Sequence, residues 1–160
     1  MPGVGKSTVG VILAKLTGLQ FLDTDLCIQL EAGATLQDIL EQQGYRRLRA
    51  IEQQVLLQLP LEHCVVSTGG SVVYSDSAMQ RLAAAGPVIY LRADLATLEH
   101  RVAAAPLRGI ACADSQSFAD VFNERTPLYQ RYADLTVDAT TGSADEVASS
   151  VLEAIVTGQG

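Results

Sequence analysis

The chain has 160 residues and a net charge of −7, with 48% apolar and 18% charged residues. This length suits one domain with a single core, and the composition is that of a globular protein rather than a disordered one. An acidic chain is a poor nonspecific binder of nucleic acid, and no apolar run approaches the roughly 18 residues of a membrane span. We therefore expect one domain over residues 1–160 that is cytoplasmic and monomeric, with no nucleic-acid or membrane partner.

The first predicted element is a helix that follows a glycine-rich start. The run KSTVGVILAKLTG, residues 6–18, places four apolar residues on one helical face, and its final glycine suits a helix end. The next run, LQFLD over residues 19–23, is predicted to be a short strand. The four apolar residues of the helix are Val9, Ile12, Leu13 and Leu16.

Downstream, helical periodicity alternates with short β-branched runs. Two helical pieces follow the strand, and the second is opened by Thr35 with Asp38 three residues later, which is nearly a capping box. Strands that alternate with helices indicate a parallel sheet covered on both faces, so the expected fold class is three-layer α/β. The remaining predicted helices are 45–59, 76–85, 94–104, 117–132 and 143–156, and the remaining strands are 64–67, 88–91 and 135–137.

The cysteines and the basic residues indicate the kind of chemistry to expect. Three cysteines without C-x-x-C spacing (Cys27, Cys64 and Cys112) indicate reduced thiols rather than disulfides or a zinc site. Nine of the eleven basic residues are arginine, whose planar fork suits carboxylate and phosphate groups. This bias favours dedicated anion sites, although any single arginine is explained equally well as a surface residue.

Residues 3–8, Gly-Val-Gly-Lys-Ser-Thr, match the second part of the phosphate-binding loop G-x-x-x-x-G-K-[ST]. The predicted helix gives this motif its context, because backbone N–H groups at a helix N-terminus present partial positive charge to phosphates. In such a loop Lys6 reaches the β- and γ-phosphates and the Ser7 hydroxyl coordinates Mg²⁺. The first glycine of the motif falls at position 0, and no strand precedes the loop.

Two carboxylates, Asp23 and Asp25, lie at the C-terminal end of the first predicted strand. The carboxyl ends of parallel strands form the edge at which ligands bind in open α/β folds. One carboxylate can face a metal there and the other an incoming hydroxyl. The alternative is that the aspartates only cap the next helix.

Arg49 and Glu52 lie three residues apart on one predicted helix, so they can form an ion pair. One interpretation is that Glu52 orients the Arg49 guanidinium group toward a substrate anion. The alternative is a solvent-exposed ion pair without a role in binding. The glycines of STGGS, residues 67–71, follow a strand and let a ligand approach the backbone closely, although they also suit an ordinary turn.

The order of these motifs resembles the shikimate kinase family. The residues that carry the resemblance are GVGKSTVG, FLDTD, LRAIE, VVSTGG, VIYL and ERTPLYQRYADLTVD, in the order and at the spacing of the family. The resemblance implies a P-loop kinase fold with five parallel strands, of which four are visible here. Because family members begin with a strand and a glycine ahead of the loop, Met1 looks like an internal methionine or the start of a truncated chain. We expect about 8–12 upstream codons that encode a β-branched run ending in glycine.

The resemblance further implies transfer of a phosphoryl group from ATP to the 3-hydroxyl of shikimate, a step of aromatic amino-acid synthesis. Such transfer depends on positioning and on neutralising charge. Asp25 would orient the attacking hydroxyl and accept its proton, while Asp23 and Ser7 would hold Mg²⁺. Arg49 and Arg125 would bind the substrate carboxylate. The backbone at Gly69 and Gly70 would contact the ring hydroxyls, and the implied ATP-binding residues are Gly3, Val4, Gly5, Lys6, Ser7 and Thr8, with Lys6 also catalytic.

Three departures from the family pattern stand out. Ser71 replaces a third glycine, residues 44–49 lack the usual acid and aromatic, and Ala105 stands where the lid carries an arginine. Arg108 lies beside a glycine three residues further on. We therefore predict that Arg108 is the catalytic and ATP-binding arginine of a lid at about residues 105–116. Arg101, near a helix end, suits the adenine side better.

Two other functions remain open on the sequence. One is a P-loop kinase for another hydroxy acid, of the gluconate kinase type, for which Ser71 and the altered lid leave room. The other is a nucleotide-binding protein without catalysis. Retention of Arg49 and Arg125 favours shikimate, and an intact Asp25 argues against a protein that only binds nucleotide.

Overall fold

The protein is described by a computed structural model covering residues 1–104, 110–113 and 115–158. Short strands alternate with helices along most of the chain, as the sequence predicts. The elements in order are α1 (Lys6–Thr17), β1 (Gln20–Asp23), α2 (Thr24–Ala32), α3 (Leu36–Gln58), β2 (Cys64–Ser67), η1 (Val72–Tyr74), α4 (Asp76–Ala85), β3 (Ile89–Arg92), α5 (Leu95–Ala103), α6 (Phe118–Tyr132), β4 (Leu135–Asp138) and α7 (Ala144–Thr157).

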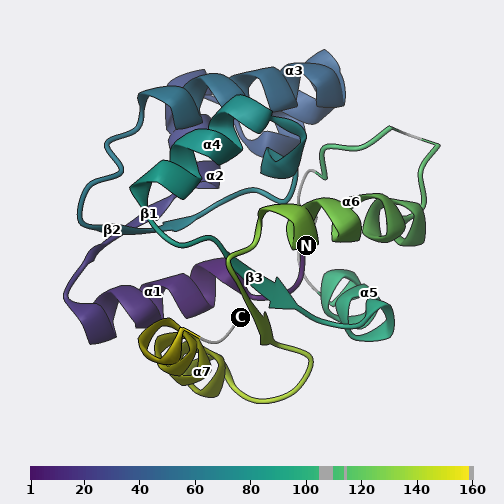
Figure 1. Ribbon diagram of the computed structural model, residues 1–160. Coiled ribbons are helices and arrows are strands. Elements are labelled where there is room, and N and C mark those ends of the chain that lie inside the picture. Colours follow the sequence, from purple (N-terminus) through teal and green to yellow (C-terminus); the bar gives the residue numbers. More distant parts are fainter. Residues whose placement is uncertain (105–109, 114, 159–160) are drawn as a thin grey trace.

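The elements form three layers with the strands in the middle (Figure 1). Helices α2, α3 and α4 lie on one side of the strands, and α1 and α7 pack against each other on the opposite side. Helices α5 and α6 flank the end of the molecule where β3 ends. This arrangement confirms the predicted α/β class.

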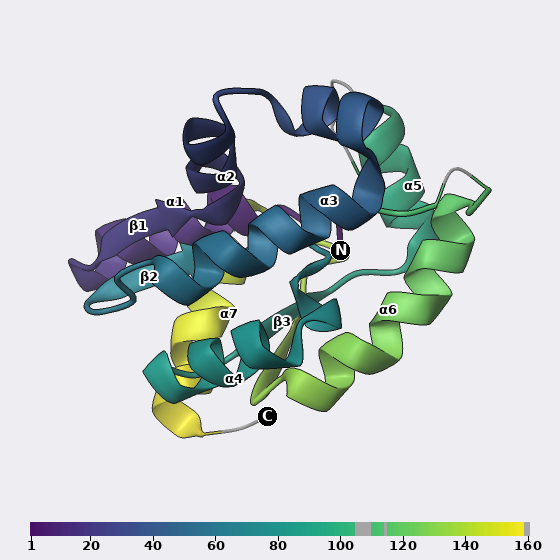
Figure 2. The same ribbon diagram turned by 90° about the horizontal axis from the view of Figure 1, so that it is seen from above.

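The described strands form two separate parallel pairs rather than one continuous sheet. Strand β1 pairs with β2, so that Asp23 is opposite Ser67, and β3 pairs with β4, so that Arg92 is opposite Asp138. Seen from above, β3 lies apart from β1 and β2 (Figure 2). A cavity of about 330 Å³ separates the pairs, lined by β2, β3 and side chains of α1, α4 and α7.

Local signals set the helix ends. The predicted capping box between Thr35 and Asp38 is present at the start of α3, and Ser117 and Ser143 begin α6 and α7 in the same way. Helix α3 is interrupted at Gly44, which has a φ of 78° that an L-residue rarely adopts. This break agrees with the sequence, which predicts one helical piece from Thr35 and a separate helix over residues 45–59.

The expected apolar faces are mostly buried or partly buried. The stripe on α3 contributes Leu48, Ile51, Val55 and Leu56 to the core, as predicted. On α1, Val9 is buried, whereas Leu16 is 57% exposed. Ile12 and Leu13 of the same face are partly buried against the core, so the predicted stripe covers the core only up to its last member.

The three cysteines are free, as expected. Among the described residues, no helix is long and apolar enough to cross a membrane.

Candidate active site

The phosphate-binding loop leads directly into α1. Gly3 and Gly5 have φ values of 80° and 93°, and a Cβ on Gly3 would lie 2.9 Å from Val102 Cγ2, so glycine is required there on two grounds. Gly5 is the N-cap of α1 and provides no side-chain cap for the first turn. The N–H groups of that turn are therefore free of a side-chain cap and suited to donate hydrogen bonds to an anion.

Lys6, the first residue of α1, lies near the carboxylates at the end of β1. Its Nζ donates a hydrogen bond of 2.9 Å to the Met1 carbonyl oxygen. Burial lowers the pKa of Lys6, while the nearby Asp25 and Asp23 oppose that shift. A half-buried ammonium group with two carboxylates nearby is suited to bind a polyphosphate.

Ser7 and Asp23 meet although they are 16 residues apart in sequence. Ser7 Oγ donates to Asp23 Oδ2 at 2.6 Å, while Asp23 Oδ1 accepts the Asp25 backbone N–H at 2.9 Å and so caps α2. Asp23 is therefore both a helix cap and a neighbour of the phosphate-binding loop.

This pair of oxygen ligands fits Mg²⁺, which binds proteins through one or two carboxylates and takes its remaining ligands from water and substrate phosphates. No group of three or more His, Cys, Asp or Glu side chains among the described residues could hold a metal. Any magnesium ion here needs phosphate or water as further ligands.

The loop after β2 packs against the start of α2. The Gly69 N–H donates to Thr24 Oγ1 at 3.1 Å, and a Cβ on Gly69 would lie 2.3 Å from Glu52 Oε1 and 3.0 Å from Asp25 Oδ1. Only glycine allows these carboxylates to approach the loop so closely. Thr24, fully buried, was not assigned a role from the sequence although it lies between the two aspartates.

Glu52 contacts a different partner from the one that its spacing suggests. It accepts a hydrogen bond from Ser71 Oγ and is only 4% exposed. The only ion pair within 4 Å among the described residues joins Arg92 and Asp138, so the predicted pairing with Arg49 is absent. Burial raises the pKa of Glu52 to about 7; the Ser71 hydrogen bond opposes this, and Asp25 adds to it.

Arg49 and Arg125 come from α3 and α6 and converge on one oxygen atom. Arg49 Nη2 and Arg125 Nη2 donate to the Ala111 carbonyl oxygen at 2.9 and 2.7 Å. Arg125 is 1% exposed, and Arg49 Nε is buried without a hydrogen-bond partner among the described residues. Two guanidinium groups from distant helices therefore share one oxygen acceptor.

Two tyrosines to which the sequence analysis assigned no role lie beside these arginines and the loop after β2. The Tyr74 ring lies against both guanidinium groups, and Tyr129 Oη donates to the Gly70 carbonyl oxygen at 2.6 Å. Burial raises the pKa of both phenols, so they remain neutral donors. Tyr129 belongs to the quoted PLYQRY run, whereas no periodicity or motif points to Tyr74.

A second cavity, of about 340 Å³, opens beside these groups and is lined by Arg49, Glu52, Ser71 and Tyr74 among others. Arg101 does not line this cavity. It donates to the carbonyl oxygens of Ala139 and Thr140, the two residues that follow β4, both at 3.0 Å. The predicted lid arginine, Arg108, lies outside the described residues, as does Ala105.

A phosphate-binding loop at the head of α1, carboxylates after the adjacent parallel strand and a two-arginine anion site beside them define a P-loop kinase of a small anionic molecule.

Comparison with known proteins narrows this class. The family model of shikimate kinase matches residues 2–156. Shikimate kinase 2 of Enterobacter sp. (strain 638) is 34% identical over 158 residues, which cover 96% of this chain and 90% of that protein. Shikimate kinase 2 of Pectobacterium carotovorum is also 34% identical, over 160 residues that cover 96% of this chain and 91% of that protein.

Solved structures agree. The shikimate kinase from Acinetobacter baumannii, determined in complex with shikimate, superposes with a TM-score of 0.85 at 31% identity, over 99% of this chain and 90% of that one. That of Aquifex aeolicus gives 0.79 at 25% identity, over 97% and 91%. The chain belongs to the shikimate kinase family.

Proposed function

We propose that this protein is a shikimate kinase, which transfers the γ-phosphoryl group of ATP to the 3-hydroxyl of shikimate in aromatic amino-acid synthesis. The observation that carries the assignment of substrate is the convergence of Arg49 and Arg125 on a single oxygen. Two guanidinium groups at one point suit a carboxylate, which shikimate has. The protein is expected to act as a cytoplasmic monomer.

The chain's own residues divide the work between the two substrates. The loop of residues 3–8 binds the phosphates, with Lys6 and the first-turn N–H groups of α1 placed against negative charge. Arg49 and Arg125 hold the shikimate carboxylate, and the backbone at Gly69 and Gly70 limits the space for its ring. Asp25 orients the attacking hydroxyl and accepts its proton.

Ser7 and Asp23 are the residues that would hold Mg²⁺, since their oxygens lie 2.6 Å apart beside the phosphate-binding loop. When bound, the ion neutralises charge on the phosphates. Asp23 keeps its orientation because its other oxygen caps α2.

A substrate panel tests the assignment. ADP release is measured with shikimate and with gluconate at equal concentrations, with Mg²⁺ and ATP saturating. We expect ADP release with shikimate and none with gluconate. Preference for gluconate would favour the gluconate kinase reading, and no turnover with either acid would favour a protein that only binds nucleotide.

The role of Asp25 is tested by Asp25→Asn. Loss of a positioned proton acceptor typically lowers the rate by about 10²–10⁴-fold, so kcat should fall within that range while ATP affinity is kept. ATP affinity is measured directly by calorimetry. Turnover close to that of the wild type would remove Asp25 from the catalytic step.

Arg108 is proposed as the lid arginine that neutralises charge on the transferred group. Removal of such an arginine costs related enzymes about 10³–10⁵-fold in rate. The rate of single-turnover phosphoryl transfer is compared for Arg108→Ala and Arg101→Ala. Arg101 serves as the control because its guanidinium group already donates to the carbonyl oxygens of the two residues that follow β4. A large loss is expected only for Arg108→Ala, and an unchanged rate would contradict the proposal.

A further inference from the structure

Tyr74, the last residue of η1, contacts both arginines of the anion site through different parts of its side chain. Arg49 Cζ lies 3.7 Å from the centroid of the Tyr74 ring, and Arg125 Cζ lies 5.4 Å from it. The Tyr74 hydroxyl accepts a hydrogen bond from Arg125 Nε at 3.3 Å. Tyr74 therefore connects α3 and α6 at the site where their arginines meet.

Arg49 needs such a support because no carboxylate lies within 4 Å of it among the described residues. Glu52, the expected partner, is engaged by Ser71 instead. An aromatic face attracts a guanidinium group and holds it flat without neutralising its charge. The charge of Arg49 therefore stays available for a ligand, whereas a carboxylate partner would compete with that ligand.

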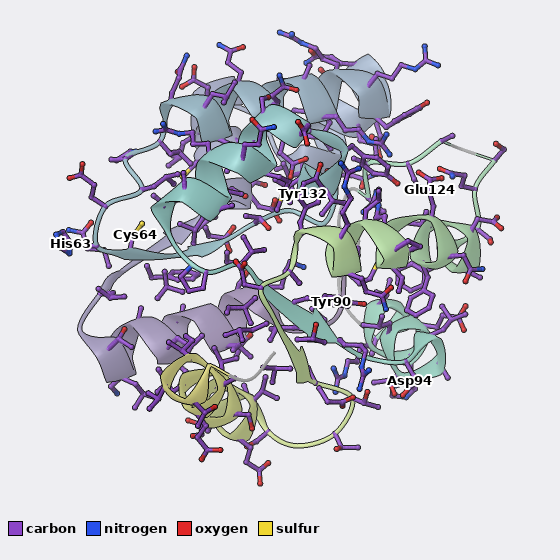
Figure 3. The ribbon with its side chains drawn as sticks, in the orientation of Figure 1. His63, Cys64, Tyr90, Asp94, Glu124 and Tyr132 are labelled. Atoms are coloured by element: carbon purple, nitrogen blue, oxygen red, sulfur yellow. The ribbon has the colours of Figure 1, made fainter. Side chains whose placement is uncertain are left out.

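The Tyr74 ring is itself fixed from α6. Its hydroxyl donates to the Glu124 carboxylate, which also accepts a hydrogen bond of 2.8 Å from Gln116 Nε2. Glu124 lies on α6, one residue before Arg125 in the sequence (Figure 3). The same helix thus supplies one arginine of the site and the acid that orients the ring beneath the other.

We propose that Tyr74 is a positioning residue for the substrate carboxylate, with its ring holding Arg49 and its hydroxyl steadying Arg125. The inference rests on the proposed function, since the carboxylate in question is that of shikimate. Tyr74 acts through the two arginines. Its loss should therefore affect shikimate binding and leave ATP binding and the chemical step nearly unchanged.

The experiment compares Tyr74→Leu, which removes ring and hydroxyl, with Tyr74→Phe, which keeps the ring. The range for cation–π contacts predicts a rise in the shikimate KM of about 2- to 30-fold for Tyr74→Leu, with about tenfold as the central expectation. The ATP KM and kcat should stay within about twofold of the wild type, and Tyr74→Phe should restore most of the shikimate affinity. Tyr74→Met is measured alongside, so that a poorly folding leucine variant does not decide the result.

Tyr132→Leu is the matched control. Tyr132 also donates to a carboxylate, Asp76 at 2.8 Å, and also has an arginine, Arg131, 5.3 Å from its ring, but it ends α6 away from the anion site. Its loss should leave the shikimate KM unchanged.

Equal shikimate KM values for Tyr74→Leu and Tyr74→Phe, or parallel rises in both substrate KM values with a lower Tm, would overturn the role of Tyr74. A wild-type protein without shikimate turnover would instead overturn the proposed function, so the two failures are distinguishable.

Discussion

Glu52 is the residue whose surroundings give the clearest pH dependence. Burial raises its pKa to about 7 in the folded protein, against about 4.5 when unfolded, so the folded state holds the proton more tightly. Its contribution to stability is then fully present below about pH 4.5, falls as the pH rises from there to about 7, and stays lost above that.

Replacing Glu52 by Gln should remove this pH dependence. At pH 8 the free energy of unfolding of Glu52→Gln should exceed that of the wild type by about 1–3 kcal/mol, and the difference should vanish toward pH 5. Urea unfolding at the two pH values measures it. Glu31→Gln, at an exposed position on α2, is the control and should leave the profile unchanged. A wild-type profile that Glu52→Gln leaves intact would show that Glu52 is ionised in the folded protein at neutral pH.

At the scale of elements, the Ala111 carbonyl group joins the segment of residues 110–113 to the anion site, while Ala111 itself is buried in the apolar cluster of α2 and α3. The Ala111 oxygen accepts hydrogen bonds from both Arg49 and Arg125. A carboxylate is a stronger acceptor than a neutral carbonyl, since charge-assisted hydrogen bonds are roughly twice as strong. Shikimate should therefore take the place of the Ala111 carbonyl oxygen when its carboxylate enters, and its binding should loosen this segment by breaking both hydrogen bonds.

Cys112, the next residue, reports this loosening. In a Cys27→Ser/Cys64→Ser background, shikimate without nucleotide should raise the rate of thiol labelling at Cys112 by at least about tenfold, since even one lost hydrogen bond to a charged group is worth about 1.5–3 kcal/mol. Shikimate methyl ester, which lacks the negative charge, is the control and should change the rate little. Slower or unchanged labelling with shikimate would contradict displacement of the Ala111 carbonyl oxygen.

At the scale of the whole molecule, the gap between the two strand pairs is the main structural feature. Within the described part of the chain, each of β2 and β3 pairs on one side only, so their other edges lack the ladder hydrogen bonds that a parallel sheet normally makes. The cavity of about 330 Å³ between them is lined by β2, the loop after it and β3, and by side chains of α1, α4 and α7. One more parallel strand between β2 and β3 would pair with both of these edges.

We predict that an upstream extension of about 8–12 residues, β-branched and ending in glycine, fills this cavity and joins the two pairs. Burying about four apolar side chains there should stabilise the fold by several kcal/mol, at about 1.5–3 kcal/mol each, and raise Tm by at least about 10 °C. Thermal unfolding of the extended and the 160-residue chains measures this. A Gly/Ser extension of equal length should give no gain, and equal Tm values for all three would refute the prediction.

Local chemistry made the helices and strands predictable from the sequence. Thr35 with Asp38 and Ser117 with Asp120 cap helices through atoms only three residues apart, so the signal is present in a short stretch of chain. The phosphate-binding loop and the Asp23–Thr24–Asp25 run were equally readable, because backbone turns and strand ends require those residue types. Their meeting, with Ser7 on Asp23, follows from the parallel α/β order.

The choice of partners was decided only by the tertiary structure. Arg49 and Glu52 have the spacing of a helical ion pair, yet Glu52 binds Ser71 and Arg49 stacks on Tyr74, because the loop after β2 and η1 lies nearer than the helix neighbour. Pairing within a helix is a weak preference of about 0.2–0.5 kcal/mol, which burial and long-range contacts easily exceed. The sequence by itself therefore determined the elements, their order and the phosphate-binding chemistry. The packing of α3, η1 and α6 decided which side chains hold the anion site together, since contacts between distant segments leave no periodic trace in the chain.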